Sequence, residues 1–221
     1  MRRSAINQKI ASAKQIAGRN LRVLPAWSDW SEAEYRENPD VAKFLFDRQM
    51  GWDITDFGAG NFAERGLVLF CLRNGIQGAA DERPYAEKML VVEEGQETPF
   101  HLHKIKLEDI INCAGGNLMI EFLDAADEDA PVTVRSDGQA IRLAPREALR
   151  LKPGQSVTVE RGVYHRFYGE AGHGPVLAWE VSQVNDDHAD NYFLEELGRF
   201  STIEEDERSV NPLWHELSAH Y

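Results

Sequence analysis

Short apolar segments separated by turn-forming pairs run through the chain from residue 67 to residue 184. The clearest pair, Asp137-Gly138, lies between two strand-forming segments, as in a β-hairpin. Similar turn-forming pairs at Asn74-Gly75 and Pro153-Gly154 leave no room for long helices. This pattern is typical of an antiparallel β-sandwich or barrel. We expect strands within segments 67–73, 86–93, 98–103, 109–112, 118–123, 132–134, 139–143, 148–152, 156–159, 165–168 and 176–184.

The N-terminal residues follow a helical pattern instead. Apolar residues between Ile6 and Ala17 recur at three- and four-residue spacing, which predicts an amphipathic helix over residues 4–18. Ser31 followed by Glu34 has the sequence of a capping box and predicts the start of a second helix. No internal repeat indicates a second barrel. We therefore expect three parts: a helical region over residues 1–60, a barrel over 61–200 and a C-terminal tail over 201–221.

Composition excludes several classes of partner. The 221-residue chain has a formal net charge of -13, which argues against nucleic acid and anionic membrane surfaces as partners. It has no apolar run of about 18 residues, the length that a transmembrane helix needs. The basic start is not followed by the apolar segment of a signal peptide, so we expect a cytoplasmic protein. Cys71 and Cys113, the two cysteines, are expected to be buried thiols.

Two histidines, His101 and His103, lie within one predicted strand. Successive side chains of a strand point to opposite faces, so these two share a face, as two ligands of one small ion must. Two ligands on a helix would be three or four residues apart. Glu108 follows and adds a carboxylate, and glycines at positions 95 and 115 frame the segment. The spacing therefore indicates the first half of a metal site on a sheet.

A third histidine ends a second turn-rich segment, Gly154-x7-Gly162-x2-His165. The two segments together offer three imidazoles and one carboxylate, which can converge on one divalent cation. Mixed nitrogen and oxygen ligands with open coordination positions suit Mn²⁺, Fe²⁺ or Co²⁺. Zn²⁺ is the second choice, because catalytic zinc usually has three protein ligands. Two open positions would accept the neighbouring carbonyl and hydroxyl oxygens of an open-chain aldose.

The two segments resemble the two motifs of the cupin superfamily, whose small antiparallel barrels hold a divalent metal. The resemblance implies a mainly β fold, a single cupin barrel of the antiparallel jelly-roll type with N-terminal helices packed outside. The second segment differs from the usual cupin pattern at two positions, Glu160 and Gly169, neither of which is a ligand. By this resemblance the metal ligands are His101, His103, Glu108 and His165.

Longer strings resemble the D-lyxose isomerase family, a group of aldose-ketose isomerases among the cupins. The resemblance runs from about Ile6 to Glu207 and is carried by segments 51–58, 85–88, 101–112, 180–187 and 191–207. It implies Mn²⁺-dependent interconversion of D-lyxose and D-xylulose, with D-mannose and D-fructose as a secondary pair, in a homodimer. A free, neutral sugar also agrees with the acidic net charge better than a strongly anionic substrate does.

Proton transfer beside a carbonyl needs a base and a cationic or acidic helper. Nearness to the metal motifs and the family resemblance together select four candidates: Glu195, Lys106, Lys88 and Glu180. In the resulting hypothesis the metal holds O1 and O2 of the linear sugar, and Glu195 moves the proton from C2 to C1. The two lysines stabilise or relay hydroxyl protons, and Glu180 is the reserve base. A hydride shift between C1 and C2 remains an alternative route.

Other functions stay open from the residues alone. A metal-dependent dioxygenase would use the same four ligands, although its site is normally lined by apolar and aromatic groups. A non-catalytic sugar-binding or regulatory cupin is another alternative, but no basic helix-turn-helix segment accompanies the barrel. A phosphosugar isomerase is closer to the first choice, yet the sequence offers no clear phosphate cradle.

Overall fold

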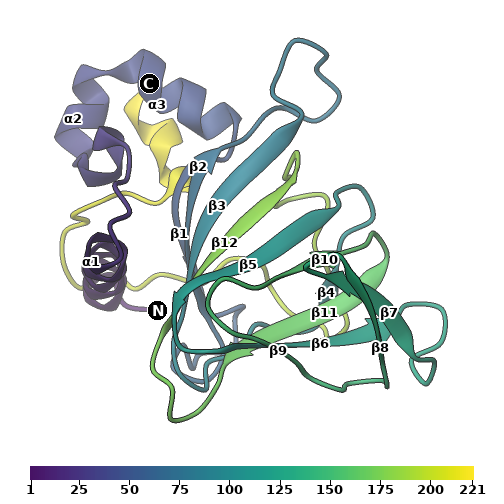
Figure 1. The fold of residues 1–221 in the computed structure, drawn as a ribbon. Helices are drawn as coiled ribbons and strands as arrows, with labels where there is room; N and C mark the ends of the chain where they lie inside the picture. Colours follow the sequence, from purple (N-terminus) through teal and green to yellow (C-terminus); the bar gives the residue numbers. More distant parts are fainter.

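Two antiparallel sheets face each other in the computed structural model, which describes all 221 residues (Figure 1). The larger sheet is ordered β1 (Gly51–Thr55), β2 (Leu67–Arg73), β3 (Tyr85–Val92), β12 (Val176–Gln183), β5 (Glu108–Gly115), β10 (Ser156–Val159), β7 (Val132–Ser136) and β8 (Gln139–Leu143). The smaller sheet is ordered β13 (Tyr192–Phe193), β4 (His101–Leu102), β11 (Val163–Gly169), β6 (Leu118–Asp124) and β9 (Leu149–Leu151). The expected mainly β barrel of antiparallel strands is confirmed.

The space between the sheets is filled by apolar side chains from alternate strand positions. On β7, Val132 and Val134 are buried and the intervening Thr133 is exposed. Leu118, Ile120 and other inward residues of β6 join them in one cluster of 18 buried residues. The predicted turn at 137–138 joins β7 to β8, whose residues pair in antiparallel register. Alternation along the strands therefore places the core as the sequence indicates.

The helices pack against the outer face of the larger sheet, at the end formed by β1, β2 and β3 (Figure 1). Ile6 and Ile10 of the first helix are fully buried there beside Phe70 and Trp179. The helices are α1 (Arg3–Arg19), η1 (Ala26–Asp29), α2 (Glu32–Glu37), α3 (Pro39–Asp47) and η2 (Trp214–His220). The expected helices outside the barrel are thereby confirmed. No helix is both long enough and apolar enough to span a membrane.

Several local predictions are confirmed and others are incomplete. The Glu34 carboxylate accepts the backbone N–H of Ser31 at 2.7 Å, so the capping box forms at the start of α2. Five elements were not predicted: η1, α3, β1, β13 and η2. Both cysteines are free, and Cys71 is buried, whereas Cys113 is partly exposed. Strand β1, within the residues assigned to the helical region, forms the edge of the larger sheet.

Candidate active site

Three histidine side chains converge on one point between the sheets. His101 and His165 are cross-strand partners on β4 and β11, and their ring centroids are 4.2 Å apart. His103 follows β4, with its ring centroid 5.1 Å from that of His101. One ligand nitrogen from each ring lies within 4.8 Å of the others. The triad could therefore hold a metal ion, as two neighbouring strands bring its members together.

The backbone fixes how these rings present their nitrogens. Each Nδ1 faces a backbone carbonyl oxygen: that of Pro99 at 2.9 Å for His101, that of Val163 at 3.4 Å for His165, and that of Asp190 for His103. A carbonyl oxygen only accepts hydrogen bonds, so Nδ1 carries the proton in each ring. Each Nε2 then keeps a free lone pair, which is the form that binds a metal.

Burial keeps the imidazoles of His101 and His103 uncharged. Desolvation, with a smaller contribution from the neighbouring His165, lowers the pKa of His101 to about 3. Burial and the Lys106 ammonium also hold the pKa of His103 well below its usual range. Metal binding requires neutral imidazole, so these side chains are ready as ligands at neutral pH.

Glu108, the first residue of β5, places its carboxylate beside the histidine triad. Its Oε1 lies 2.9 Å from Nε2 of His165 and its Oε2 lies 3.5 Å from Nε2 of His103. The buried Nε2 of His165 nevertheless has no hydrogen-bond partner, because the short contact lacks hydrogen-bond geometry. Hydrogen-bond acceptors that lie close together with no proton between them are typical of several ligands of one cation. The four residues therefore fit a divalent metal.

A buried row of charges begins at this carboxylate. Lys106 places its Nζ 2.7 Å from Glu108 Oε2 and 2.7 Å from Glu180 Oε1. Lys88 lies next in the row, 3.2 Å from the same Glu180 oxygen, and donates to Asn185 Oδ1 at 2.7 Å. Burial opposes the charge of Lys106, but the two glutamates together raise its pKa above the usual value. Burial also opposes ionisation of Glu108, yet Lys106 and His103 keep its pKa well below the usual range.

The charged row and the histidines line one and the same pocket. Three of the four catalytic candidates line it: Lys88, Lys106 and Glu180. Apolar side chains from both sheets and from one loop also line it: Phe57, Leu67, Leu69, Leu90, Ile110, Phe167 and Phe193. The histidines and Glu108 form one end of the pocket, which we call the metal-fitting end. The pocket combines this end with charged groups and with an apolar wall that limits access of water.

Glu195, the fourth candidate, lies outside this lining. Its side chain is 55% exposed and its Oε2 is 3.0 Å from the Arg65 guanidinium. The other carboxylate oxygen accepts from the same guanidinium at 3.4 Å. Both oxygens of Glu195 are thus engaged on the outside of the pocket.

Three further charged residues at the site had no signal in the sequence analysis. Arg199 and Asp187 line the pocket, and Asp53 is buried behind them on β1. Nη2 of Arg199 lies 2.7 Å from Asp53 Oδ2 and 3.2 Å from Asp187 Oδ2. All three lie in strings that carry the family resemblance, which was the one available hint.

Comparison with known sequences gives nearly full-length matches. The sequence model of the D-lyxose isomerase family matches residues 1–217. A D-lyxose/D-mannose isomerase of Escherichia coli O157:H7 is 43% identical over 213 residues, which is 94% of each chain. A D-lyxose/D-mannose isomerase of Serratia proteamaculans is also 43% identical, over 98% of this chain and 97% of its own.

Solved structures with the same fold include bacterial L-ribose isomerases. The ligand-free enzyme of Cellulomonas parahominis matches with a TM-score of 0.57 at 16% identity, over 88% of this chain and 96% of its own. The Geodermatophilus obscurus enzyme matches with a TM-score of 0.52 at 17% identity, over 82% and 98%. At such low identity these matches establish a shared arrangement of strands and nothing more.

Proposed function

The chain belongs to the D-lyxose isomerase family, and from this membership we propose that it interconverts free aldoses and ketoses. The preferred pair is D-lyxose and D-xylulose, and D-mannose and D-fructose form the second pair. The observation that carries the proposal is the 43% identity to two D-lyxose/D-mannose isomerases over nearly the whole chain. The pocket supports it, because a metal-fitting cluster and buried acid–base groups face the same space.

The metal would be held by His101, His103, Glu108 and His165, and we propose Mn²⁺ because the ligands mix nitrogen and oxygen. When bound, such an ion polarises the substrate carbonyl as a Lewis acid. Co²⁺, Fe²⁺ and Zn²⁺ are the alternatives. The assembly that we propose, by similarity to the family, is a homodimer.

Glu180 is the residue best placed to move the proton between C2 and C1. All of its contacts, from Lys106, Lys88 and Ser182, fall on Oε1. Its Oε2 has no protein partner and belongs to a side chain that lines the pocket. A carboxylate oxygen that is held in place but not engaged can accept a proton from substrate and return it. We therefore place Glu180 ahead of Glu195, whose oxygens both contact Arg65 outside the pocket.

The lysines serve as fixed positive charges. The pKa of Lys106 is raised by Glu108 and Glu180, so its ammonium remains protonated and donates. Negative charge develops on the substrate oxygens when the C2 proton leaves, and a buried cation stabilises it more strongly than one in water. Lys88, tied to Asn185 and Glu180, is held for the same role at the next hydroxyl.

A sugar panel tests the proposal. Protein stripped of metal and reloaded with Mn²⁺ is given free pentoses and hexoses, and ketose formation is measured. We expect turnover of D-lyxose and, more slowly, of D-mannose. Oxygen consumption is followed in the same samples, because a dioxygenase would use O₂ and an isomerase would not. Absence of ketose from every sugar in the panel would overturn the proposal.

A further inference from the structure

The cluster formed by Arg199, Asp187 and Asp53 has no part in the proton transfer described above. Nη1 of Arg199 is buried and has no hydrogen-bond partner, and neither does Oδ1 of Asp53. A buried guanidinium N–H without an acceptor costs free energy, because it loses its hydrogen bond to water. Arg199 and Asp187 also line the same pocket as the histidines. An unsatisfied donor at a pocket wall indicates a position where a ligand supplies the missing acceptor.

The cluster is held rigidly enough to recognise a ligand. The Thr55 hydroxyl of β1 donates to the backbone carbonyl of Arg199 at 2.7 Å. The guanidinium carbon of Arg199 lies 5.2 Å from the centre of the Phe200 ring. The Asp187 N–H donates to Gln49 Oε1 at 2.7 Å. A polar group fixed on both its backbone and its side chain loses little freedom when it binds a hydroxyl.

The sheet order places this cluster away from the metal-fitting end. Glu108 is on β5, and β12, β3 and β2 separate that strand from β1, which carries Asp53. The buried row of charges runs in the same direction, from β5 toward β1. Lys106 and Glu180 adjoin Glu108, and Lys88 follows on β3. A substrate whose carbonyl end is at the histidines would therefore extend toward Arg199.

We propose that Arg199 and Asp187 bind the hydroxyl groups at the far end of the open-chain sugar and so determine substrate length and terminal chemistry. Nη1 of Arg199 donates to the terminal hydroxyl oxygen, and the Asp187 carboxylate accepts the proton of a neighbouring hydroxyl. A hydroxyl both donates and accepts, which matches such a mixed pair. This inference rests on the proposed isomerase function.

The charges of the cluster also exclude one substrate class. Two carboxylates, Asp187 and Asp53, surround a single guanidinium within 3.2 Å. Burial raises the pKa of the Asp187 carboxyl, but Arg199 and Lys88 lower it by more, so the carboxylate stays ionised. A terminal phosphate dianion would meet net negative charge there. The far end therefore selects a neutral hydroxyl over a phosphate.

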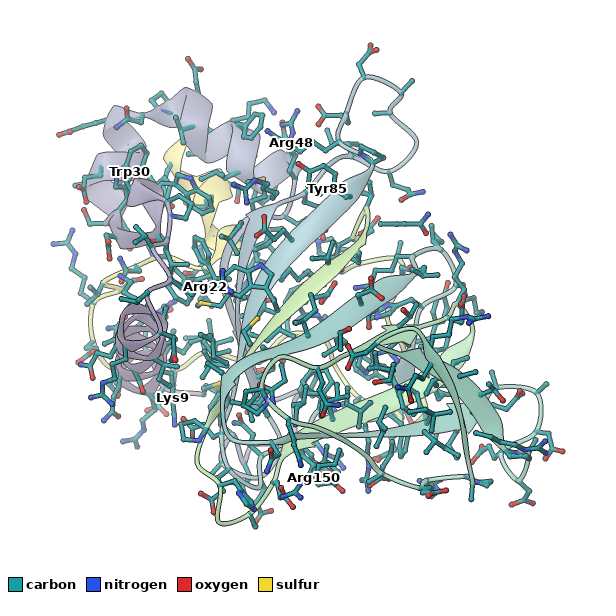
Figure 2. All side chains as sticks on the ribbon, in the orientation of Figure 1. Lys9, Arg22, Trp30, Arg48, Tyr85 and Arg150 are labelled. Carbon is teal, nitrogen blue, oxygen red and sulfur yellow. The ribbon has the colours of Figure 1, made fainter.

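The test compares D-lyxose with 5-deoxy-D-lyxose, which lacks only the terminal hydroxyl. The variant is Arg199→Lys, which keeps a positive charge for the two aspartates but loses the second N–H arm. The matched control is Arg48→Lys, since Arg48 has 13% side-chain exposure against 12% for Arg199 and pairs with Glu82 where α3 meets the sheet (Figure 2). Asp187→Asn serves as a second variant if Arg199→Lys does not fold.

We expect the unaltered protein to prefer D-lyxose by about 10- to 100-fold in kcat/KM, the usual effect of one charge-assisted hydrogen bond. In Arg199→Lys that preference should fall to within about threefold, because only D-lyxose loses a contact, while Arg48→Lys keeps the full preference. A purely structural role of Arg199 would lower both rates and leave their ratio unchanged, which would overturn the inference. An equal preference in the unaltered protein would overturn it too. Failure of the unaltered protein to isomerise either sugar would instead refute the isomerase function.

Discussion

Replacing Glu180 with glutamine removes the proposed base, and with it one of the two buried negative charges beside Lys106. The side-chain oxygen of glutamine can still accept the hydrogen bonds from Lys106 and Ser182 that Oε1 receives at 2.7 and 3.0 Å. The amide nitrogen that takes the place of Oε2 cannot accept a proton. The histidines and Glu108 are untouched, so metal binding should persist. A positioned base contributes about 10²- to 10⁴-fold, which corresponds to about 3 to 5 kcal/mol of activation free energy.

The assay is ketose formation from D-lyxose by protein of known metal content. We expect kcat of Glu180→Gln to fall by at least about 100-fold, with a metal stoichiometry close to that of the unaltered protein. The thermal midpoint should fall, because Lys88 and Lys106 lose a buried partner. Glu195→Gln is the matched control, because it makes the same chemical change at a carboxylate that is 55% exposed and bound to Arg65. The control should retain activity within about threefold. Near-full turnover by Glu180→Gln, or a large loss in Glu195→Gln alone, would refute the assignment.

Three further predictions concern other parts of the molecule. In D₂O, D-xylulose formed from D-lyxose should carry deuterium at C1, as mass spectrometry can show; a hydride shift would leave that carbon unlabelled. Gly169→Ala should lower the free energy of unfolding by about 1 to 3 kcal/mol in urea titrations, because an added Cβ would lie 2.5 Å from the Glu93 carbonyl oxygen. An unchanged midpoint would contradict that packing. Burial raises the pKa of the Cys71 thiol to about 12, so stability should fall as pH rises above about 8.5, where the unfolded thiol ionises first. Above that pH the free energy of unfolding should fall more steeply in the unaltered protein than in Cys71→Ala, by up to about 1.4 kcal/mol per pH unit. Equal pH dependence in the two proteins would contradict this prediction.

The metal-fitting cluster was accessible from sequence because it depends on short-range periodicity. The period of two predicted that His101 and His103 lie on one side of a strand, and their rings do lie close together although β4 ends at Leu102. Glycine-rich turns indicated the region where the strand that carries the distant His165 begins. In the structure that histidine is the cross-strand partner of His101. The spacing in the sequence and the strand pairing in the structure thus both bring the three histidines together.

The position of Glu195 could not be derived in the same way. It would share the inward face of Phe193 only if β13 continued for two more residues. The strand ends at Phe193 after two residues, and the side chain of Glu195 turns outward to Arg65. Nearness in sequence to the motif does not determine where the side chain points, because the regular alternation has already ended at Glu195.

The cluster formed by Arg199, Asp187 and Asp53 could not be predicted from local sequence spacing. Asp53 lies far from Asp187 and Arg199 in the chain, and only the folded sheet brings it to them. Strand β1, by contrast, had a usable signal, since Trp52-Asp53-Ile54-Thr55 alternates apolar and polar residues, although all five residues of the strand are buried. Helix α3 had a usable signal, since Asn38-Pro39 places proline at the first helical position.

The most direct test of the account is a crystal structure of Mn²⁺-loaded protein with D-xylulose, recorded with anomalous scattering from manganese. The account predicts one strong anomalous peak bounded by the Nε2 atoms of His101, His103 and His165 and by the Glu108 carboxylate. The sugar should extend from that peak past Glu180 toward Arg199. A structure with no peak at this position, or with the three imidazoles directed away from one another, would contradict the central claim.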